Sequence, residues 1–292
     1  MLANLPLRHR PPWHFRLAKW MIRHRIPGGY HLVELGERMG WLDCLVRYRL
    51  SDRVSVDVPL NRRETQWAEP DLWAYEGRLV AVLALALEAL RRPVTWIDCG
   101  ADIGTLTALT AAHSPQIDDV IAIEPNPQVQ DLLARNMTLL PFPARALAVA
   151  VADFQGRGRL EHFPTLRSDH SRFLVPDEQG GISVTRLDDL DLPEGKALAI
   201  KIDVEGGELA VLQGAANALR NAPAWIVAFE AHRLVAERSG IDPCACVRLL
   251  LERGASDAIV AEAPGLRLDP QQPYFEQVRD LKVSNVVCMK RS

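Results

Sequence analysis

The chain has 292 residues, enough for one large domain or two smaller ones. Its composition, with 48% hydrophobic and 24% charged residues, is that of a soluble globular protein. The formal net charge of −3 excludes a global attraction to nucleic acid or to anionic lipid. Because no apolar run reaches the roughly 18 residues that a membrane span needs, the sequence predicts no transmembrane helix.

Cysteine usage and the N-terminus predict a cytoplasmic protein. The five cysteines are odd in number and irregular in spacing, which favours free thiols in a reducing compartment. They are Cys44, Cys99, Cys244, Cys246 and Cys288. The N-terminus is basic, but Arg16, Lys19 and Arg23 interrupt the apolar core that a signal peptide needs.

Residues 1–30 combine basic and aromatic side chains and contain no acidic residue. One interpretation is a surface helix that makes peripheral contact with an anionic membrane. The alternative, which we favour, is an N-terminal arm whose aromatic side chains dock on the main domain. It is favoured because Pro11, Pro12 and Pro27 leave only a short helix.

A β-hairpin and a helix are expected next along the chain. Cys44–Leu50 and Val54–Leu60 are rich in β-forming residues and flank a short polar turn, which predicts the hairpin. A helical stretch over Leu72–Leu90 follows. We therefore expect residues 1–90 to form an N-terminal extension, a cap or dimer element of a homo-oligomer, and residues 91–292 to form the main domain.

From residue 94 onwards, short apolar runs alternate with helical segments. The expected strands are Val94–Asp98, Val120–Glu124, Ala146–Val151, Ala197–Asp203, Ala224–Glu230, Ala258–Ala261 and Val283–Met289. The expected helices are Thr105–Ala112, Pro127–Leu139, Glu208–Arg220 and Pro243–Arg253. This alternation predicts an α/β domain with a mostly parallel sheet covered by helices on both faces. Such sheets bind ligands at the carboxyl ends of their strands.

The first of these strand ends carries the motif D-x-G-x-D-x-G, formed by Asp98, Gly100, Asp102 and Gly104. Dinucleotide-binding loops have glycine at the first position. A carboxylate there would repel a pyrophosphate, but it suits a ligand with an ammonium and a sulfonium group. S-adenosylmethionine (SAM) has both, and its carboxylate suits the start of the following helix. The motif therefore favours SAM over NAD.

The next two strand ends supply further candidates for cofactor binding. Glu124 ends the second strand at the distance where an acid meets ribose hydroxyls in this architecture. Asn126 follows it at the start of a helix. Asp153, after the third strand, is placed to accept a hydrogen bond from an adenine amino group, although an ordinary turn explains it equally well.

Later strand ends supply candidates for catalysis. Asp203 ends one strand, and Glu230 and His232 end the next. His232 is the natural general base by its pKa, with Asp203 or Glu230 orienting it or positioning a hydroxyl. A divalent cation such as Mg²⁺, held by Asp203 and Glu230, is an alternative. His170 lies in a loop that could cover the site, although a structural role is the simpler interpretation.

With these loops and the run "KIDVEGGE", Lys201 to Glu208, the sequence resembles the FkbM family of SAM-dependent methyltransferases. The run "TRLDDL", Thr185 to Leu190, resembles a segment that usually precedes it. The resemblance implies a Rossmann-like class I methyltransferase fold with a seven-stranded, mostly parallel sheet. It also implies methyl transfer to oxygen, often on sugars or natural products. Asp102 departs from the asparagine that is common in the family, and "SDHS", Ser168 to Ser171, departs from a small Gly/Ser-rich loop.

The sequence therefore predicts a SAM-dependent O-methyltransferase whose partner is a small-molecule or glycan hydroxyl acceptor. The alternative is a catalytically inactive module of the same fold that acts as a scaffold in a biosynthetic complex. An NAD(P)-dependent oxidoreductase is disfavoured by Asp98. A nucleic-acid methyltransferase is disfavoured because the core lacks a basic stripe with aromatic residues and a base-flipping motif.

Overall fold

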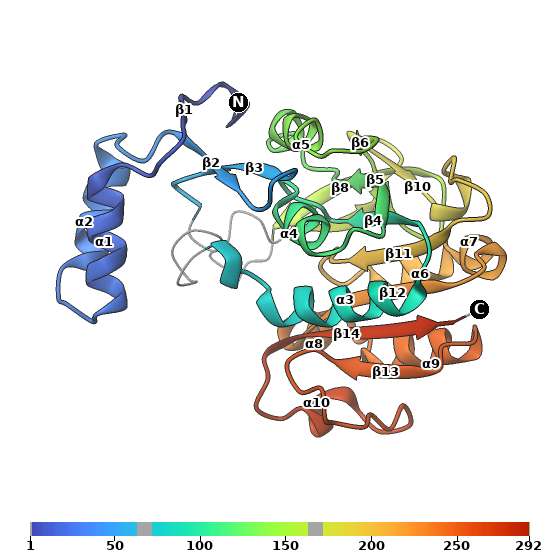
Figure 1. Cartoon of the computed structure of the whole chain (residues 1–292). Coiled ribbons are helices and arrows are strands. Elements are labelled where there is room, and N and C mark those ends of the chain that lie inside the picture. Colours follow the sequence, from blue (N-terminus) through green and yellow to red (C-terminus); the bar gives the residue numbers. More distant parts are fainter. Residues whose placement is uncertain (1, 63–71, 163–171, 292) are drawn as a thin grey trace.

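The computed structural model describes residues 2–62, 72–162 and 172–291. Its centre is a seven-stranded sheet in the order β13-β14-β12-β11-β4-β5-β6 (Figure 1). The strands are β4 (Val94–Cys99), β5 (Ile117–Ile123), β6 (Ala144–Leu147), β11 (Ala197–Ile202), β12 (Trp225–His232), β13 (Asp257–Val260) and β14 (Val283–Lys290). All neighbours pair in parallel except those of β14. This topology confirms the predicted Rossmann-like fold.

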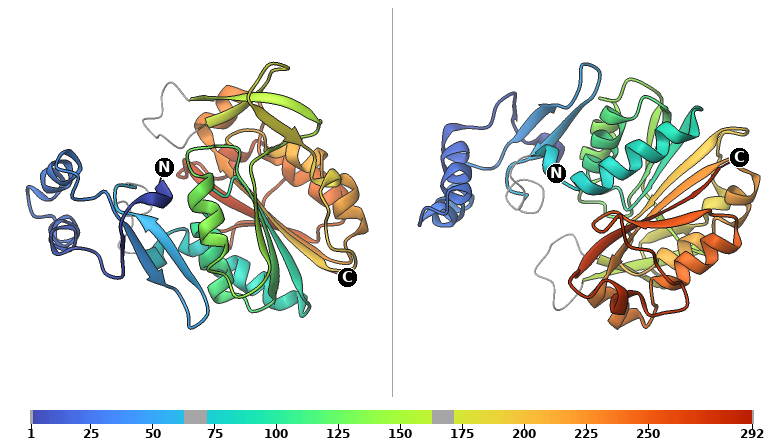
Figure 2. Two further views of the ribbon diagram at one scale, coloured as in Figure 1. Left: turned by 90° about the horizontal axis from the view of Figure 1, so that it is seen from above. Right: turned by 60° about the horizontal axis from the view of Figure 1, so that its bottom comes forward.

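Helices cover both faces of this sheet, as Figure 2 shows from two directions. One face packs on α3 (Gly77–Leu90), α4 (Thr105–His113) and α5 (Gln130–Met137). The other packs on α6 (Glu208–Gln213), α7 (Ala216–Asn221), α9 (Cys244–Glu252) and α10 (Tyr274–Gln277). The remaining helix of this part, α8 (Arg233–Ser239), directly follows β12. Side chains of one strand alternate between the two cores, so Ile226 and Ala228 face one and Val227 and Phe229 face the other.

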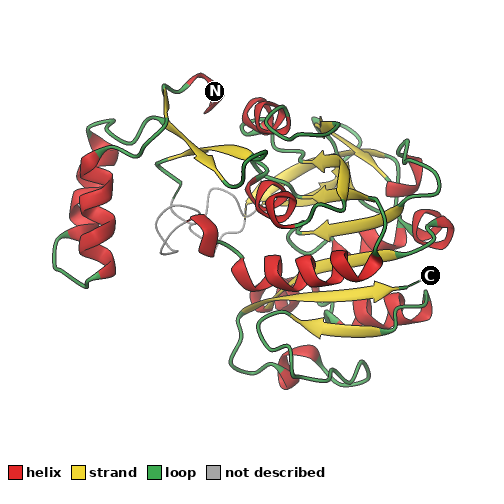
Figure 3. Ribbon diagram, viewed as in Figure 1, coloured by secondary structure: helices red, strands yellow, loops and turns green. Residues whose placement is uncertain are grey.

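A four-stranded sheet, β7-β10-β8-β9, lies beside the main sheet and was not predicted (Figure 3). Its strands are β7 (Ala150–Val151), β8 (Gly156–His162), β9 (Arg172–Pro176) and β10 (Ile182–Thr185), and the short 3-10 helix η4 (Leu187–Asp189) follows them. The single strand expected over Ala146–Val151 is therefore wrong. The chain leaves the main sheet after Leu147 and joins the small one at Ala150.

The helix expected over Glu208–Arg220 is divided into α6 and α7 for a local reason. A Cβ atom on Gly214 would lie 2.1 Å from the carbonyl oxygen of Ala152, so the chain passes close to the small sheet there. The Asp188 carboxylate then accepts hydrogen bonds from the backbone N–H groups of Asn217 and Ala218. This cap starts a new helix.

The N-terminal extension forms a separate small layer. A three-stranded sheet, β1-β2-β3, contains the predicted hairpin, and the helices α1 and α2 lie between β1 and β2 in the sequence. The elements are η1 (Leu2–Asn4), β1 (Leu7–Arg8), α1 (Trp13–Arg23), α2 (Gly29–Arg38), β2 (Leu45–Arg49), β3 (Ser55–Pro59) and η3 (Leu72–Ala74). Figure 1 shows α1 and α2 standing away from the main sheet. The helix expected from Leu72 starts only at Gly77.

Two further expectations can be compared with the described residues. All five cysteines are buried and free. Within the parts of the chain that the structure describes, no helix has the length and apolarity to cross a bilayer. The loop with His170 and the run Ser168 to Ser171 lies outside the described residues, and the boundary near residue 90 stays a prediction.

A buried polar contact joins the hairpin to the main domain. The carboxylate of Asp57 on β3 is fully buried and pairs with Arg47 of β2 at 2.7 Å and with Arg135 of α5 at 2.9 Å. The side chain of Asn136 on α5 accepts a hydrogen bond from the Asp57 N–H and donates to the carbonyl oxygens of Asp57 and Ile103. These bonds hold the hairpin against α5 and the loop that precedes α4.

Asn136→Ala should lower the free energy of unfolding by about 3 kcal/mol, because three buried backbone groups would lose their partner. Urea denaturation followed by circular dichroism measures this. The exposed Asn221 at the end of α7 provides the control, since Asn221→Ala should change stability by less than about 0.5 kcal/mol. Equal stability of the two variants would contradict the proposed attachment.

Candidate active site

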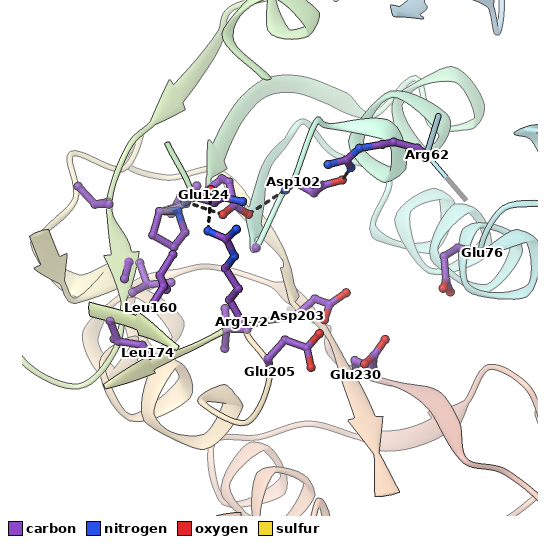
Figure 4. A pocket seen from close by; sticks show the side chains of 18 of the residues that line it. Arg62, Glu76, Asp102, Glu124, Leu160, Arg172, Leu174, Asp203, Glu205 and Glu230 are labelled. Atoms are coloured by element: carbon purple, nitrogen blue, oxygen red, sulfur yellow. Dashed lines mark hydrogen bonds and ion pairs between the residues drawn. The ribbon is translucent and has the colours of Figure 1, made fainter. Parts of the chain in front are cut away.

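A cavity of about 370 Å³ opens where parallel strands of the main sheet end (Figure 4). β5, β4, β11 and β12 are neighbours in parallel, so their carboxyl ends meet at one edge. The lining includes six of the predicted site residues: Gly100, Asp102, Glu124, Asn126, Asp203 and Glu230. The edge of the sheet therefore brings together residues that are up to 130 positions apart in the sequence.

The turn after β4 depends on Gly100. Its φ angle is +84°, and a Cβ atom would lie 1.8 Å from the carbonyl oxygen of Asp203. The loop after β4 and the loop after β11 are also joined by a hydrogen bond of 2.9 Å from the Asp203 N–H to the Cys99 carbonyl oxygen. Only glycine permits this approach, which places Asp203 beside the first loop.

Glu124 is held by the backbone on both of its carboxylate oxygens. The Asp102 N–H donates to one oxygen at 3.0 Å, and the Asn126 N–H donates to the other at 2.8 Å. Burial raises the pKa of Glu124 to about 7, although the bond from Asn126 opposes this shift. A carboxylate fixed in this way, with lone pairs still facing the cavity, suits a diol.

Asp102, the departure from the family pattern, forms an ion pair with Arg62 of the N-terminal extension. Its φ angle of +50° is one that asparagine and aspartate adopt more readily than most residues. The extra negative charge beside the first loop is therefore neutralised by a residue that lies 40 positions earlier.

Asp98 lies next to the cavity and is not among its lining residues. It is almost fully buried and accepts a hydrogen bond from Thr107 of α4, which in turn accepts one from the Trp96 indole N–H. Burial raises the pKa of Asp98 to about 6, and the bond from Thr107 and the charge of Lys201 oppose this. In this structure, Asp98 fixes the loop after β4 to α4 through Thr107. When it is ionised, its negative charge lies beside the cavity and not in its lining.

Three other predicted residues also lie off the lining. Gly104 permits tight packing of α4, because a Cβ atom there would lie 2.7 Å from Met137. Asp153 is exposed in the loop after β7. His232 lies beside a second cavity of about 20 Å³, in which Glu230 also takes part. Burial lowers the pKa of His232, which favours the neutral imidazole.

The ammonium group of Lys201 is the centre of an acidic cluster. Lys201 is 2% exposed, and its Nζ lies 3.3 Å from an oxygen of Asp203. On β4, Asp98 is its neighbour in register. Burial alone would lower the pKa of Lys201, but Asp203, Glu230, Asp98 and Glu76 outweigh burial and raise it. The cluster therefore keeps a charged lysine inside the protein.

Glu230 and Glu76 are two further members of this cluster whose pKa values are raised. Burial, followed by the negative charge of Asp203, raises the pKa of Glu230 well above its usual range, and Lys201 opposes the shift. Burial likewise raises the pKa of Glu76, which accepts a hydrogen bond of 3.0 Å from Asn285 on β14. A carboxyl group with a raised pKa beside a cavity is suited to taking up a proton near neutral pH.

The sequence analysis missed the residues that enter the cavity from other elements. Arg62, Tyr75 and Glu76 come from the N-terminal extension, and Leu160, Arg172 and Leu174 come from the small sheet. None of them follows a strand of the main sheet, so the strand-end rule could not find them. The left-handed φ of +50° at Glu76 is also a backbone property that no local sequence pattern revealed.

Carboxyl groups outnumber basic groups in the described lining of the cavity. Six carboxyl groups line it, from Glu76, Asp102, Glu124, Asp203, Glu205 and Glu230, against the two guanidinium groups of Arg62 and Arg172. Figure 4 shows Asp203, Glu205 and Glu230 gathered on one side and Glu124 with Asp102 on the other. Such a lining favours a cationic or hydroxyl-bearing ligand over a pyrophosphate.

The Mg²⁺ alternative finds no donor set in the structure. Among residues 2–62, 72–162 and 172–291, no three His, Cys, Asp or Glu side chains are arranged to hold a metal ion. The pair Asp203 and Glu230 instead has the ammonium group of Lys201 beside it. This arrangement supports no metal-dependent step.

Comparison with known families decides the class of the protein. The model of the methyltransferase FkbM domain matches residues 98–281, well over half of the chain. The chain belongs to the FkbM methyltransferase family. The match runs from the end of β4 to beyond α10 and includes every predicted site residue, and it confirms the resemblance drawn from the strand-end motifs.

The chain is also similar, at low sequence identity, to three proteins that are named as methyltransferases. Hexuronic acid methyltransferase AglP of Haloferax volcanii is 28% identical over 200 residues, which cover 67% of this chain and 76% of that protein. The FkbM methyltransferase of Methylobacillus flagellatus KT is 18% identical, with a TM-score of 0.41 over 75% of this chain and 61% of the other. A SAM-dependent O-methyltransferase of Thermotoga maritima is 13% identical, with a TM-score of 0.40 over 74% and 65%.

Gly100→Ala should lower the free energy of unfolding by at least about 2 kcal/mol, because the new Cβ atom collides with the Asp203 carbonyl group at a positive φ. Thermal and urea denaturation measure the change. Gly265→Ala is the matched control, since a Cβ atom there meets nothing within 4 Å. A Gly100→Ala variant as stable as this control would contradict the close approach of the two loops.

Proposed function

We propose that the protein is a SAM-dependent O-methyltransferase that acts on a hydroxyl group of a sugar, a glycan or a natural-product small molecule. The observation that carries the proposal is that one cavity contains two sets of acidic side chains, Glu124 with Asp102 in the first and Asp203, Glu205 and Glu230 in the second (Figure 4). Glu124, held by two backbone N–H groups, lies in one set. Glu230, with its raised pKa beside Lys201, lies in the other. The first set suits a cofactor and the second suits removal of a proton.

The residues of the first set fit the proposed cofactor. Glu124 offers a fixed carboxylate to the ribose hydroxyls, and Gly100 lets a ligand approach the backbone closely. The negative lining favours a sulfonium and an ammonium group and disfavours the pyrophosphate of NAD. When bound, SAM supplies an electrophilic methyl group.

The residues of the second set fit the remaining step, which is removal of the acceptor's proton. Glu230 is placed to take up the proton of the acceptor hydroxyl, and SAM would supply the methyl group and leave as S-adenosylhomocysteine. Asp203, 38% exposed at the cavity, accepts a hydrogen bond from the acceptor and holds it in place. Lys201 opposes the rise in the pKa of Glu230 and so increases the fraction of this base that is ionised. His232 lies beside the smaller cavity and is not needed for this step.

A sugar acceptor is supported by the chemistry of the cavity and by one relative. Carboxylate oxygens accept hydrogen bonds from hydroxyl groups, and several of them line the second half of the cavity. Hexuronic acid methyltransferase AglP, the relative from Haloferax volcanii, is named for a sugar acid. An acceptor with several neighbouring hydroxyl groups fits both observations.

Transfer of a labelled methyl group from SAM tests the function directly. The purified protein should label at least one member of a panel of sugars, uronic acids, nucleotide sugars and glycans. Glu230→Gln should lower turnover at least about 100-fold with little change in the affinity for S-adenosylhomocysteine, because glutamine cannot take up the proton. Glu178→Gln, at an exposed position in the turn between β9 and β10, is the control.

Full turnover by Glu230→Gln would refute its role as the base. Binding of S-adenosylhomocysteine without transfer to any acceptor of the panel would support the alternative of an inactive scaffold.

The rate should rise with pH through the raised pKa of Glu230, because only the ionised carboxylate can act as the base. Lys201→Met removes the cation that lowers this pKa, so the rising limb of the pH–rate profile should move up by about one pH unit. Asp203→Asn removes the negative charge that raises it, so the limb should move down by a similar amount and turnover should also fall.

Profiles of kcat at saturating SAM measure both shifts. If Lys201 and Asp203 had purely structural roles, the two variants would have lower rates, but the rising limbs of their pH–rate profiles would not move in opposite directions. Shifts of the same sign, or none in Asp203→Asn, would contradict the assignment of Glu230.

A further inference from the structure

The helical pair α1–α2 and the turn that follows it carry most of the exposed apolar surface. Eight of the thirteen exposed large hydrophobic side chains in the described part of the chain lie between positions 13 and 41. They are Trp13, Leu17, Trp20, Ile26, Tyr30, Leu35, Met39 and Trp41. Such a concentration on a globular protein marks an interaction surface.

Two opposite faces of α1 are apolar, and among the residues that the structure describes only one of these faces packs into a hydrophobic core. Phe15 and Ala18 are buried in a small core with residues of α2 and β2. Trp13, Leu17 and Trp20 follow one another at helical spacing on the other side, and they are 73%, 39% and 52% exposed. The expectation that the aromatic residues of the arm dock on the main domain is therefore wrong for these three side chains, since Phe15 packs in a core of the extension itself and the two tryptophans are exposed.

Positive charge surrounds this outer face. Arg16 and Arg23 are exposed and lie beside the Trp13–Leu17–Trp20 stripe on the helical surface, and α1 contains no acidic residue. Residues 1–42 carry seven lysine or arginine residues and two glutamates. The other 250 residues carry 27 basic and 35 acidic residues. The extension is therefore basic on a protein that is otherwise acidic.

We propose that the outer face of α1 docks on an anionic membrane surface. Tryptophan and leucine enter the boundary between headgroups and acyl chains, while Arg16 and Arg23 pair with lipid phosphates. With 11 residues, α1 is about 16 Å long, which suits a helix lying in the interface rather than across it. The position of α1 and α2 at the far end of the molecule leaves this face accessible (Figure 1).

Other partners fit this face less well. A second copy of the chain would bring two basic faces together, and their mutual repulsion opposes such a dimer. Nucleic acid would satisfy the arginines and offer bases on which the indole rings can stack, but it would leave Leu17 without an apolar environment. A lipid interface satisfies both kinds of side chain.

Co-sedimentation of the full chain with lipid vesicles tests the proposal independently of catalysis. Vesicles of phosphatidylcholine with about one part in four of phosphatidylglycerol should bind the protein, and vesicles of phosphatidylcholine alone should bind it far less. Trp13→Ala with Trp20→Ala, and separately Arg16→Glu with Arg23→Glu, should each weaken binding at least about tenfold. High salt should weaken the binding of the wild type.

Two matched controls should bind as the wild type does. Trp73→Ala removes an indole that is 47% exposed outside α1, and Arg267→Glu with Arg291→Glu reverses two exposed charges near the C-terminus. Circular dichroism melting curves check that every variant is folded.

The proposal is overturned if the wild type does not prefer anionic vesicles at low salt, or if both α1 variants bind like the controls. Sedimentation velocity without lipid adds a further outcome. A dimer that is lost in the tryptophan variant would assign the face to a second copy of the chain and would equally overturn the proposal.

Discussion

The buried ammonium group of Lys201 is the interaction on which the active-site edge of the sheet depends. An isolated charge at this depth would cost several kcal/mol, but Asp203 at 3.3 Å and the neighbouring Asp98 and Glu230 offset the cost. The dependence is mutual, since Lys201 lowers the pKa values of Asp98, Glu76 and Glu230 against the effect of burial. One contact thus permits several acids to line a single cavity.

The central strands of the main sheet could be predicted from the sequence because they are largely buried and appear as apolar runs, whereas the partly exposed edge strand β6 was misplaced. The small sheet could not be predicted, since Gly156–His162 is largely polar and partly exposed and Ala150–Val151 has only two residues. The end of α6 also escaped prediction. It depends on Asp188 and on the carbonyl group of Ala152, which meet Gly214 and its neighbours only after the chain has folded.

The candidate site could be predicted where it follows the strand ends, as at Gly100, Glu124 and Asp203. The direction of a side chain was harder to predict than its place in the chain. Asp98 shares the face of its strand with Trp96 and so reaches Thr107 of α4 rather than the cavity. Arg62 and Arg172 come from other layers of the molecule, and no spacing rule connects them to the strand ends.

The central claim of this account is that the acid-lined cavity holds an adenosyl methyl donor and rejects a dinucleotide. Calorimetric titration of the wild-type protein with S-adenosylhomocysteine, and with NAD for comparison, tests it most directly. We expect micromolar affinity for S-adenosylhomocysteine and no detectable binding of NAD, because the carboxylates repel a pyrophosphate. Binding of NAD with comparable affinity, or binding of neither compound, would contradict the account.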